Sequence, residues 1–186
     1  RYFMFTQVYC HHVRRIYDIH LKDFLKIWLP GGLFPISIED LIQLTDNEIT
    51  SGLSKAVRDE KHPYHDPARR IERREHISLL YQRNPTDRKI NLEASEEIFK
   101  AACEKYGESE VRYDSYIQKG GGLDFPVLSR DGRIMSSLSM SETLERMPVV
   151  AIEYVYISPS LRKKADAWLH KERDKIIAKK DVGEEL

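Results

Sequence analysis

Hydrophobic side chains at helical spacing dominate the start of the chain. From residue 1 to residue 29, apolar or aromatic groups recur every three or four positions, which predicts one long amphipathic helix. This stripe consists of Tyr2, Phe5, Tyr9, Val13, Ile16, His20, Phe24 and Trp28. The stretch Pro30-Gly31-Gly32 predicts the end of the helix.

Two short helices are predicted next, each from a capping signal. Ser37 followed by Asp40 has the spacing of a capping box and opens a helix to about Leu44. Thr45 followed by Glu48 repeats the signal. We expect this second helix to turn Ile49, Leu53 and Val57 inward.

The later chain alternates between strand and helix patterns. A glycine (Gly107) closes the first of the helices, and Asp131-Gly132 is typical of a hairpin turn. Ser139 with Glu142 predicts a capped short helix. Strands are predicted over 76–83, 111–117, 125–129, 133–138 and 149–157, and helices over 92–106, 139–147 and 158–180. The sequence therefore predicts an α+β protein, with a helical segment over 1–75 and a lobe with a mainly antiparallel sheet and flanking helices over 76–186.

Composition narrows the class of protein. The 186 residues carry 30 basic and 30 acidic side chains, so the net charge gives no strong signal for nucleic acid. No apolar run reaches the roughly 20 residues that a membrane helix needs, so no membrane partner is expected. Two cysteines form no disulfide framework and favour a reducing, cytoplasmic setting. Because the chain opens within a helical pattern and without methionine, we expect it to be the later part of a longer protein.

The dipeptide His65-Asp66 invites a metal-site interpretation. It lies in the stretch KHPYHDPARR, and a His-Asp pair helps to hold metal in a large class of phosphohydrolases. However, Pro67 disfavours helical geometry at Asp66, which makes Asp66 a natural N-cap of a helix running to about Glu75. No equivalent of the remaining ligands follows, so capping is favoured over metal binding.

Four segments, taken in order, resemble a known family. RYFMFTQVYCHHVRRIYDIHLKDFL is similar to the segment that follows the catalytic domain in HD-type deoxynucleotide triphosphohydrolases. SIEDLIQLTDNEI, DPARRIERREHISLLYQ and VVAIEYVYISPSLRKKADAWL resemble later elements of the same family. The likeness is good over 1–82 and thin over 107–140.

The resemblance implies that different parts of the full-length protein hold the metal and position the substrate. The His, His-Asp and Asp metal ligands would lie upstream of Arg1, so neither catalytic nor metal-binding residues are assigned to this chain, and a divalent metal is expected in the parent protein. Arg1 matches an arginine that contacts the triphosphate, and Tyr9 matches a tyrosine that packs against the deoxyribose. His11 and His12 stand near a regulatory nucleotide site at subunit contacts. Cys10 replaces a base-contacting glutamine, so base preference does not carry over.

Plainer interpretations accompany these roles. Without the resemblance, a tyrosine on an apolar stripe favours a core position for Tyr9. His11 and His12 would point about 100° apart on a continuous helix, which disfavours one shared metal ion. Lys119 beside three glycines lacks the phosphate-loop pattern, so a solvated hairpin loop is expected.

Three functions stay open from the sequence. The first is the C-terminal part of a metal-dependent HD-type phosphohydrolase acting on deoxynucleoside triphosphates (dNTPs). The second is a non-catalytic regulatory or oligomerisation module that binds an effector nucleotide or a sister subunit. The third is an unrelated α+β binding domain. The expected partners of the first two are a dNTP, the upstream HD domain and further copies in a homo-oligomer.

Overall fold

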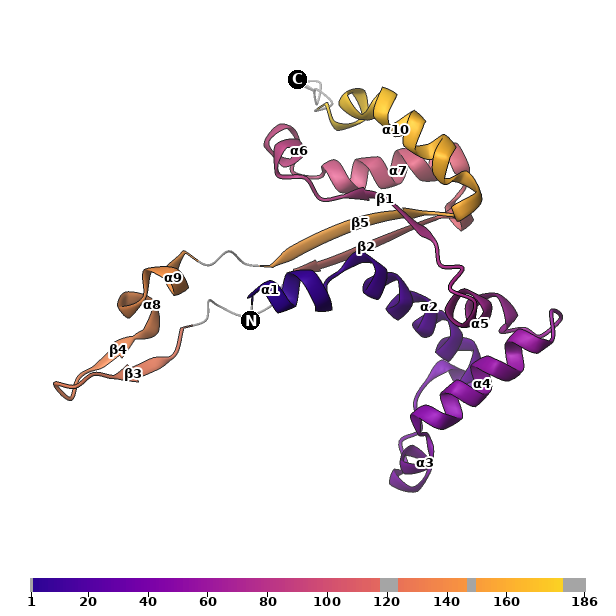
Figure 1. Cartoon of the computed structure of the whole chain (residues 1–186), viewed down its shortest axis with the longest axis horizontal. Helices are drawn as coiled ribbons and strands as arrows, with labels where there is room; N and C mark the ends of the chain where they lie inside the picture. The colour runs from indigo at the N-terminus through magenta and orange to yellow at the C-terminus, as the bar shows by residue number, and fades with distance from the viewer. Residues whose placement is uncertain (1, 118–123, 147–149, 179–186) are drawn as a thin grey trace, which may run out of the picture.

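A computed structural model describes residues 2–117, 124–146 and 150–178 of the chain (Figure 1). The described residues form a mixed α+β fold with a three-stranded antiparallel sheet and a separate two-stranded hairpin, which confirms the predicted fold class. The first helical elements are α1 (Tyr2–Met4), a π-helix (Phe5–Tyr9), α2 (His12–Trp28), α3 (Ile38–Gln43), α4 (Asp46–Arg58) and α5 (His65–Glu72). The helix α2 ends before Pro30, as the sequence predicted, and a 3₁₀ turn at Pro30–Gly32 follows it.

The main sheet contains β1 (Ser78–Gln82), β5 (Ala151–Ile157) and β2 (Val111–Ile117), in that order. Both neighbours run antiparallel to the central strand β5. Between β1 and β2 the chain forms the short helix α6 (Pro85–Ile90) and the long helix α7 (Ala94–Tyr106). A second long helix, α10 (Arg162–Ile177), follows β5. Figure 1 shows α7 and α10 on one side of the sheet and the N-terminal helices on the other.

Strand periodicity explains why β5 is buried on both faces. Alternate residues point to opposite faces of a strand. Val155 and Ile157 contribute to a core with α7 and α10, whereas Tyr154 and Tyr156 contribute to a second core with the N-terminal segment. The central strand therefore joins two layers, and its near-continuous run of apolar residues reflects that position.

A third core holds the helical part together. Phe24 of α2, Leu53 and Ala56 of α4 and Ala68 of α5 are buried in it. This agrees with the prediction that Leu53 points inward. The two capping predictions fare differently, because the Ser37 hydroxyl accepts a hydrogen bond from the Asp40 backbone N–H, at 3.1 Å, whereas the Thr45 side chain makes no capping bond.

A hairpin projects from the lobe. It consists of β3 (Pro126–Leu128) and β4 (Ile134–Ser136), followed by α8 (Ser137–Met140) and α9 (Glu142–Glu145). We call residues 124–146 the arm. Gly132 has a φ of 80° in the turn, a conformation in which glycine is favoured. None of the three cores of the described residues includes an arm residue.

Several predicted boundaries are wrong in detail. Ser139 does not cap a helix to residue 147; Ser136 and Ser141 cap α8 and α9 instead. The helix α6, begun by Asn84 as cap and Pro85, was not predicted. The last helix starts at Arg162 after a 3₁₀ turn at Pro159–Leu161. The Lys119 loop, Met147 and the expected end at Lys180 lie outside the described residues.

Candidate functional site

The N-terminal segment contains the described residues that the family resemblance singles out, and it is not one helix. The π-helix ends at Tyr9, and the next residue, Cys10, donates its N–H to the Phe5 carbonyl at 2.8 Å. The chain is extended at His11, and α2 begins at His12. The prediction of a continuous helix over 1–29 is therefore wrong at this point. Arg1 lies outside the described residues, so its alignment with Tyr9 stays a prediction.

Contacts from the central strand accompany the break. The Tyr154 hydroxyl donates to the Cys10 carbonyl at 2.8 Å, and the Tyr156 hydroxyl donates to the His12 carbonyl at 2.9 Å. Both tyrosines are buried, so these hydrogen bonds satisfy groups that water does not reach. Burial raises the pKa of both hydroxyls, which therefore stay protonated donors at neutral pH. These two hydrogen bonds hold the interruption of the helix, at Cys10 and His11, against the sheet.

Tyr9 lies at the surface and not in the core. Its side chain is 49% exposed, and its ring contacts Phe5 with 5.9 Å between the ring centres. The core position that the apolar stripe favoured is therefore wrong. Neighbouring apolar side chains of the same segment, Phe3, Met4 and Val8, are also exposed. An exposed aromatic ring among exposed apolar groups is available for contact with a ligand or a second protein surface.

His11 and His12 lie close together because of the break. His11 is the N-cap of α2, and its Nδ1 accepts from the Val13 N–H at 3.3 Å. Since His11 stands outside the helix, the two imidazole rings come within 4.3 Å of each other, contrary to the expected divergence. Burial and then the neighbouring His11 lower the pKa of His12, so its ring is neutral at pH 7. A neutral ring offers little attraction to a phosphate, whatever nucleotide approaches.

An ion pair between α2 and β2 also holds the N-terminal segment against the sheet. Arg15 of α2 donates to both carboxylate oxygens of Asp114 in β2, at 2.7 and 2.5 Å. The hydrogen bonds that Arg15 donates to Asp114 raise the pKa of Arg15 against the opposing effect of burial. Arg15 also lies over the Tyr116 ring, 5.7 Å from its centre. Sequence reasoning missed this pair because 99 residues separate its members, and nothing in the local pattern around Arg15 points to a carboxylate in β2.

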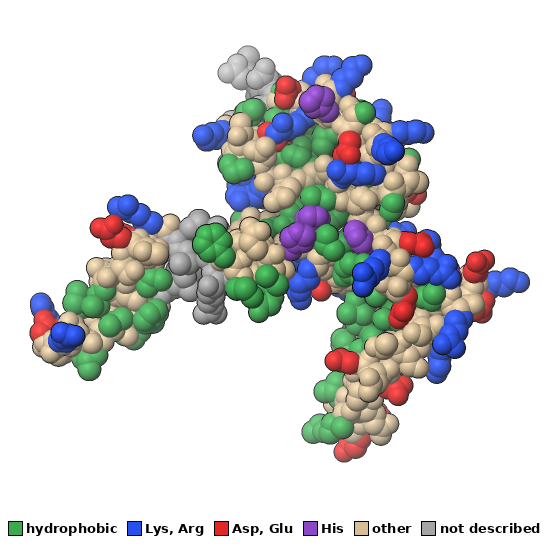
Figure 2. Space-filling view, viewed as in Figure 1, with side chains coloured by type: hydrophobic (Ala, Val, Ile, Leu, Met, Phe, Trp, Pro, Cys, Tyr) green, Lys and Arg blue, Asp and Glu red, His purple; other side chains and the backbone are tan. Residues whose placement is uncertain are grey.

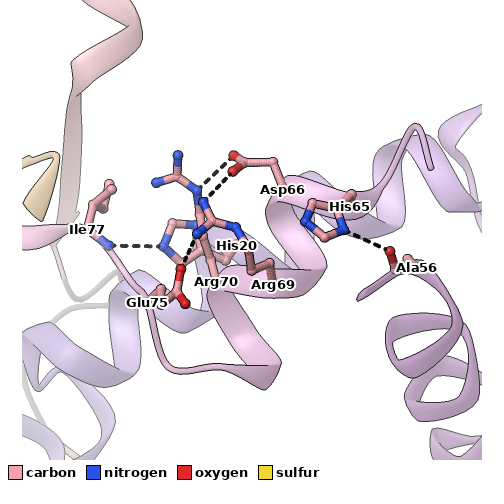
Figure 3. A network of polar contacts seen from close by, with 8 residues as sticks. All are labelled: His20, Ala56, His65, Asp66, Arg69, Arg70, Glu75 and Ile77. Carbon is pink, nitrogen blue, oxygen red and sulfur yellow. Dashed lines mark hydrogen bonds and ion pairs between the residues drawn. The ribbon is translucent and has the colours of Figure 1, made fainter. Parts of the chain in front are cut away.

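The His65-Asp66 dipeptide belongs to a network of helix contacts (Figure 3). His65 begins α5, with its Nδ1 3.1 Å from the Ala56 carbonyl oxygen. Asp66 does not cap the helix, contrary to the prediction, because it already lies within the first turn and accepts from Arg69 and Arg70. Burial alone would raise the pKa of Asp66, but these hydrogen bonds outweigh it and the pKa is lowered.

The network continues to a buried histidine. His20 of α2 is 3% exposed, and its Nε2 accepts from the Ile77 N–H at 3.4 Å (Figure 3). Burial, followed by the charge of Arg70, lowers the pKa of His20 from 6.5 to about 4. Nearby is a pocket of about 390 Å³ with equal numbers of acidic and basic groups. Its charged lining residues are Asp23, Lys26, Asp66, Arg70, Glu110 and Arg112. This balance gives the pocket no preference for an anion.

The described residues do not fit a metal site or a cysteine nucleophile. No group of three His, Cys, Asp or Glu side chains in the described part of the chain is placed to hold a metal ion. Burial raises the pKa of both Cys10 and Cys103, so each thiol is protonated and a weak nucleophile at neutral pH. Over these same residues, the helices are too short or too polar to cross a membrane.

Comparison with known proteins gives likeness only to solved structures. No family model matches the chain, and no curated protein matches it. The chain is similar to a hypothetical protein from Aquifex aeolicus, with a TM-score of 0.74 and 28% identity over 91% of this chain and 42% of that one. It is also similar to a phosphohydrolase from Bacteroides thetaiotaomicron, with a TM-score of 0.53 and 16% identity over 83% of this chain and 47% of that one. The chain thus spans less than half the length of either protein, and it shares its fold with part of a phosphohydrolase.

Proposed function

We propose that the chain is the C-terminal part of a metal-dependent HD-type phosphohydrolase that acts on dNTPs. The observation that carries the proposal is the shared fold with a phosphohydrolase over 83% of the chain, in a sequence that independently resembles HD-type triphosphohydrolases. The divalent metal would be held by an upstream HD domain, because the described residues offer no ligand group for it. A metal held there would supply activation of water for attack on phosphorus.

Substrate positioning is the role we assign to this chain. The exposed ring of Tyr9 would pack against the deoxyribose, where a 2′-hydroxyl would clash with it. Arg1 would hold phosphate oxygens, a task that suits the planar guanidinium group. The Tyr154 and Tyr156 hydrogen bonds support this role, since they fix the backbone directly after Tyr9. Precise placement of a substrate contributes to rate through orientation.

The test is nucleotide hydrolysis by the natural full-length protein. With Mg²⁺ or Mn²⁺ present, we expect release of deoxynucleoside and inorganic triphosphate from dNTPs, measured by chromatography. Tyr9→Ala should reduce the preference for dNTPs over ribonucleotides by about tenfold to a hundredfold, the discrimination that steric exclusion of one hydroxyl gives. Tyr9→Phe is the matched control, because it keeps the ring and should keep the preference. Absence of hydrolysis with every dNTP would refute the proposed activity, whereas unchanged selectivity in Tyr9→Ala would refute only the role of Tyr9.

A second candidate is a non-catalytic regulatory or oligomerisation module. The observation that favours it is the number of large apolar side chains left exposed on α3, on the segment before α3 and on the arm. His11 and His12 would then serve a subunit contact and not a phosphate group, consistent with the lowered pKa of His12. Thermal melting with and without a dNTP separates the two forms of this candidate, since a bound effector nucleotide raises the melting midpoint whereas a module that only contacts a sister subunit shows no shift.

A further inference from the structure

Two apolar surfaces of this chain have no partner among the described residues. The first is a groove of about 1450 Å³ at the junction of α2, α3 and α4. We call it the apolar groove; its main lining residues are Trp28, Leu33, Phe34, Ile36 and Leu44, with Asp40 and Glu48 at its acidic rim. Leu33 is 74% exposed and Ile36 is fully exposed. Contiguous apolar exposure of this kind marks an interaction site.

The arm is the second surface. Its strands have only three residues each, and an isolated two-stranded hairpin is marginal in water. Leu128 is 72% exposed and Ile134 is 76% exposed, with Phe125 and Met140 also exposed. The space-filling view shows hydrophobic side chains along the arm and again at the end of the molecule that holds α3 (Figure 2).

The groove is acidic, whereas the hairpin of the arm, the part that would enter the groove, is weakly basic. Residues 27–54 carry four acidic side chains and no lysine or arginine. The tip of the arm, residues 125–136, carries Arg130, Asp131 and Arg133, a net charge of +1. Asp131 pairs with Arg133, whereas Arg130 is exposed and makes no ion pair with the described residues. Opposite charges at the rims of two apolar surfaces favour their association and fix its register.

The arm does not reach the groove of its own chain. Figure 1 shows the arm and α3 at widely separated ends of the molecule, with the sheet and α2 between them. A second copy removes this difficulty, because a two-fold axis brings each arm to the other copy's groove at once. The result is a closed dimer with two identical contacts.

We propose that two copies of this protein exchange arms, each β3–β4 arm lying in the apolar groove of its partner. The exposed Leu128 and Ile134 side chains enter the groove beside Ile36, and Arg130 lies at the rim near Asp40. The inference rests on the second candidate above, a module that contacts a sister subunit, and it names the surfaces of that contact. It is independent of the proposed hydrolytic activity, since it uses neither Tyr9 nor a metal.

The experiment measures the mass in solution of the natural full-length protein by light scattering and sedimentation. Ile36→Asp alters only the groove and Ile134→Asp alters only the arm, and each should weaken dimerisation by at least about tenfold. Leu92→Asp is the matched control; Leu92 is 68% exposed, lies on neither surface, and its change should leave the mass unaltered. Circular dichroism checks that the variants, all at exposed positions, are folded.

Mixing the two variants is the decisive step. A heterodimer of Ile36→Asp with Ile134→Asp keeps one intact contact, formed by the native arm of the first and the native groove of the second. We therefore expect the mixture to associate at concentrations where each variant alone is monomeric. A double variant that carries both Asp40→Arg and Arg130→Asp exchanges the two charges. It should likewise recover the affinity between copies that either change alone removes.

Three results would overturn the proposal. One is a wild-type protein that stays monomeric up to about 100 µM, where even a weak dimer is detectable. Another is a mixture that fails to associate. The third is a pair of variants with lower stability but unchanged mass, which would mean that another segment of the same natural protein covers both surfaces.

Discussion

Acidification should destabilise the fold through His20, which is buried and neutral at the junction of α2 and β1. In the unfolded chain this histidine titrates near 6.5, and burial in the folded protein lowers its pKa to about 4. Between these values the unfolded state binds more protons than the folded state. Its contribution to stability is therefore complete above pH 6.5 and is lost as the pH falls toward 4.

The size of the effect follows from the two pKa values. At pH 5 the unfolded ring is almost fully protonated, whereas the folded ring is about one-tenth protonated, and the free energy of unfolding falls by about 2 kcal/mol relative to pH 7.5. The ring faces Arg70, Arg112, His76 and Asp66. Of these, only Asp66 favours the protonated form, and Arg69 and Arg70 already neutralise its charge.

Urea unfolding at pH 7.5 and pH 5.0 measures this effect in wild type and in His20→Gln. Glutamine keeps an oxygen that accepts from the Ile77 N–H but does not titrate. Other titrating groups contribute equally to both proteins, so the variant should lose about 2 kcal/mol less than wild type on acidification. Equal losses in the two proteins would refute the assignment of a neutral, desolvated His20.

Two further predictions concern packing and pairing. Asp87→Ala should cost roughly 3 kcal/mol, because buried Asp87 accepts two hydrogen bonds from Arg173. Asp131→Ala removes only an exposed pair and should cost much less. Chemical denaturation compares the two variants, and equal costs would contradict the burial argument. Gly52→Ala should destabilise the protein by about 1 kcal/mol despite the better helix propensity of alanine, because the new methyl group would lie 2.8 Å from the indole nitrogen of Trp28. A shift in tryptophan fluorescence should accompany the loss of stability. A more stable variant with unchanged fluorescence would show that α2 and α4 move apart without cost.

Local patterns predicted most elements of the fold. The alternation in VRYDSYI and the Ser37 cap act within a few residues, so the sequence alone predicted β2 and α3. The break at Cys10 and His11 was not predictable in this way. It accompanies hydrogen bonds from tyrosines 144 residues later, and apolar periodicity continues across it without a signal.

Prediction of the candidate site from the sequence was also limited by contacts between distant parts of the chain. The stripe that placed Tyr9 inside assumed an unbroken helix, so the π-helix and the break changed which face Tyr9 occupies. Aromatic residues at alternate positions of β5 were the one usable signal, since Tyr154 and Tyr156 share a face. What that face contacts depends on the tertiary fold and not on the strand itself.

The hydrogen bonds that Tyr154 and Tyr156 donate to the segment after Tyr9 end on main-chain carbonyl oxygens, which every amino acid has. Docking at position 12 is thus indifferent to the identity of the half-buried side chain there, provided that it fits the available space. Substitutions at this position can change which molecules the surface prefers while the scaffold stays intact. Divergent specificities can accordingly evolve on one unchanged backbone.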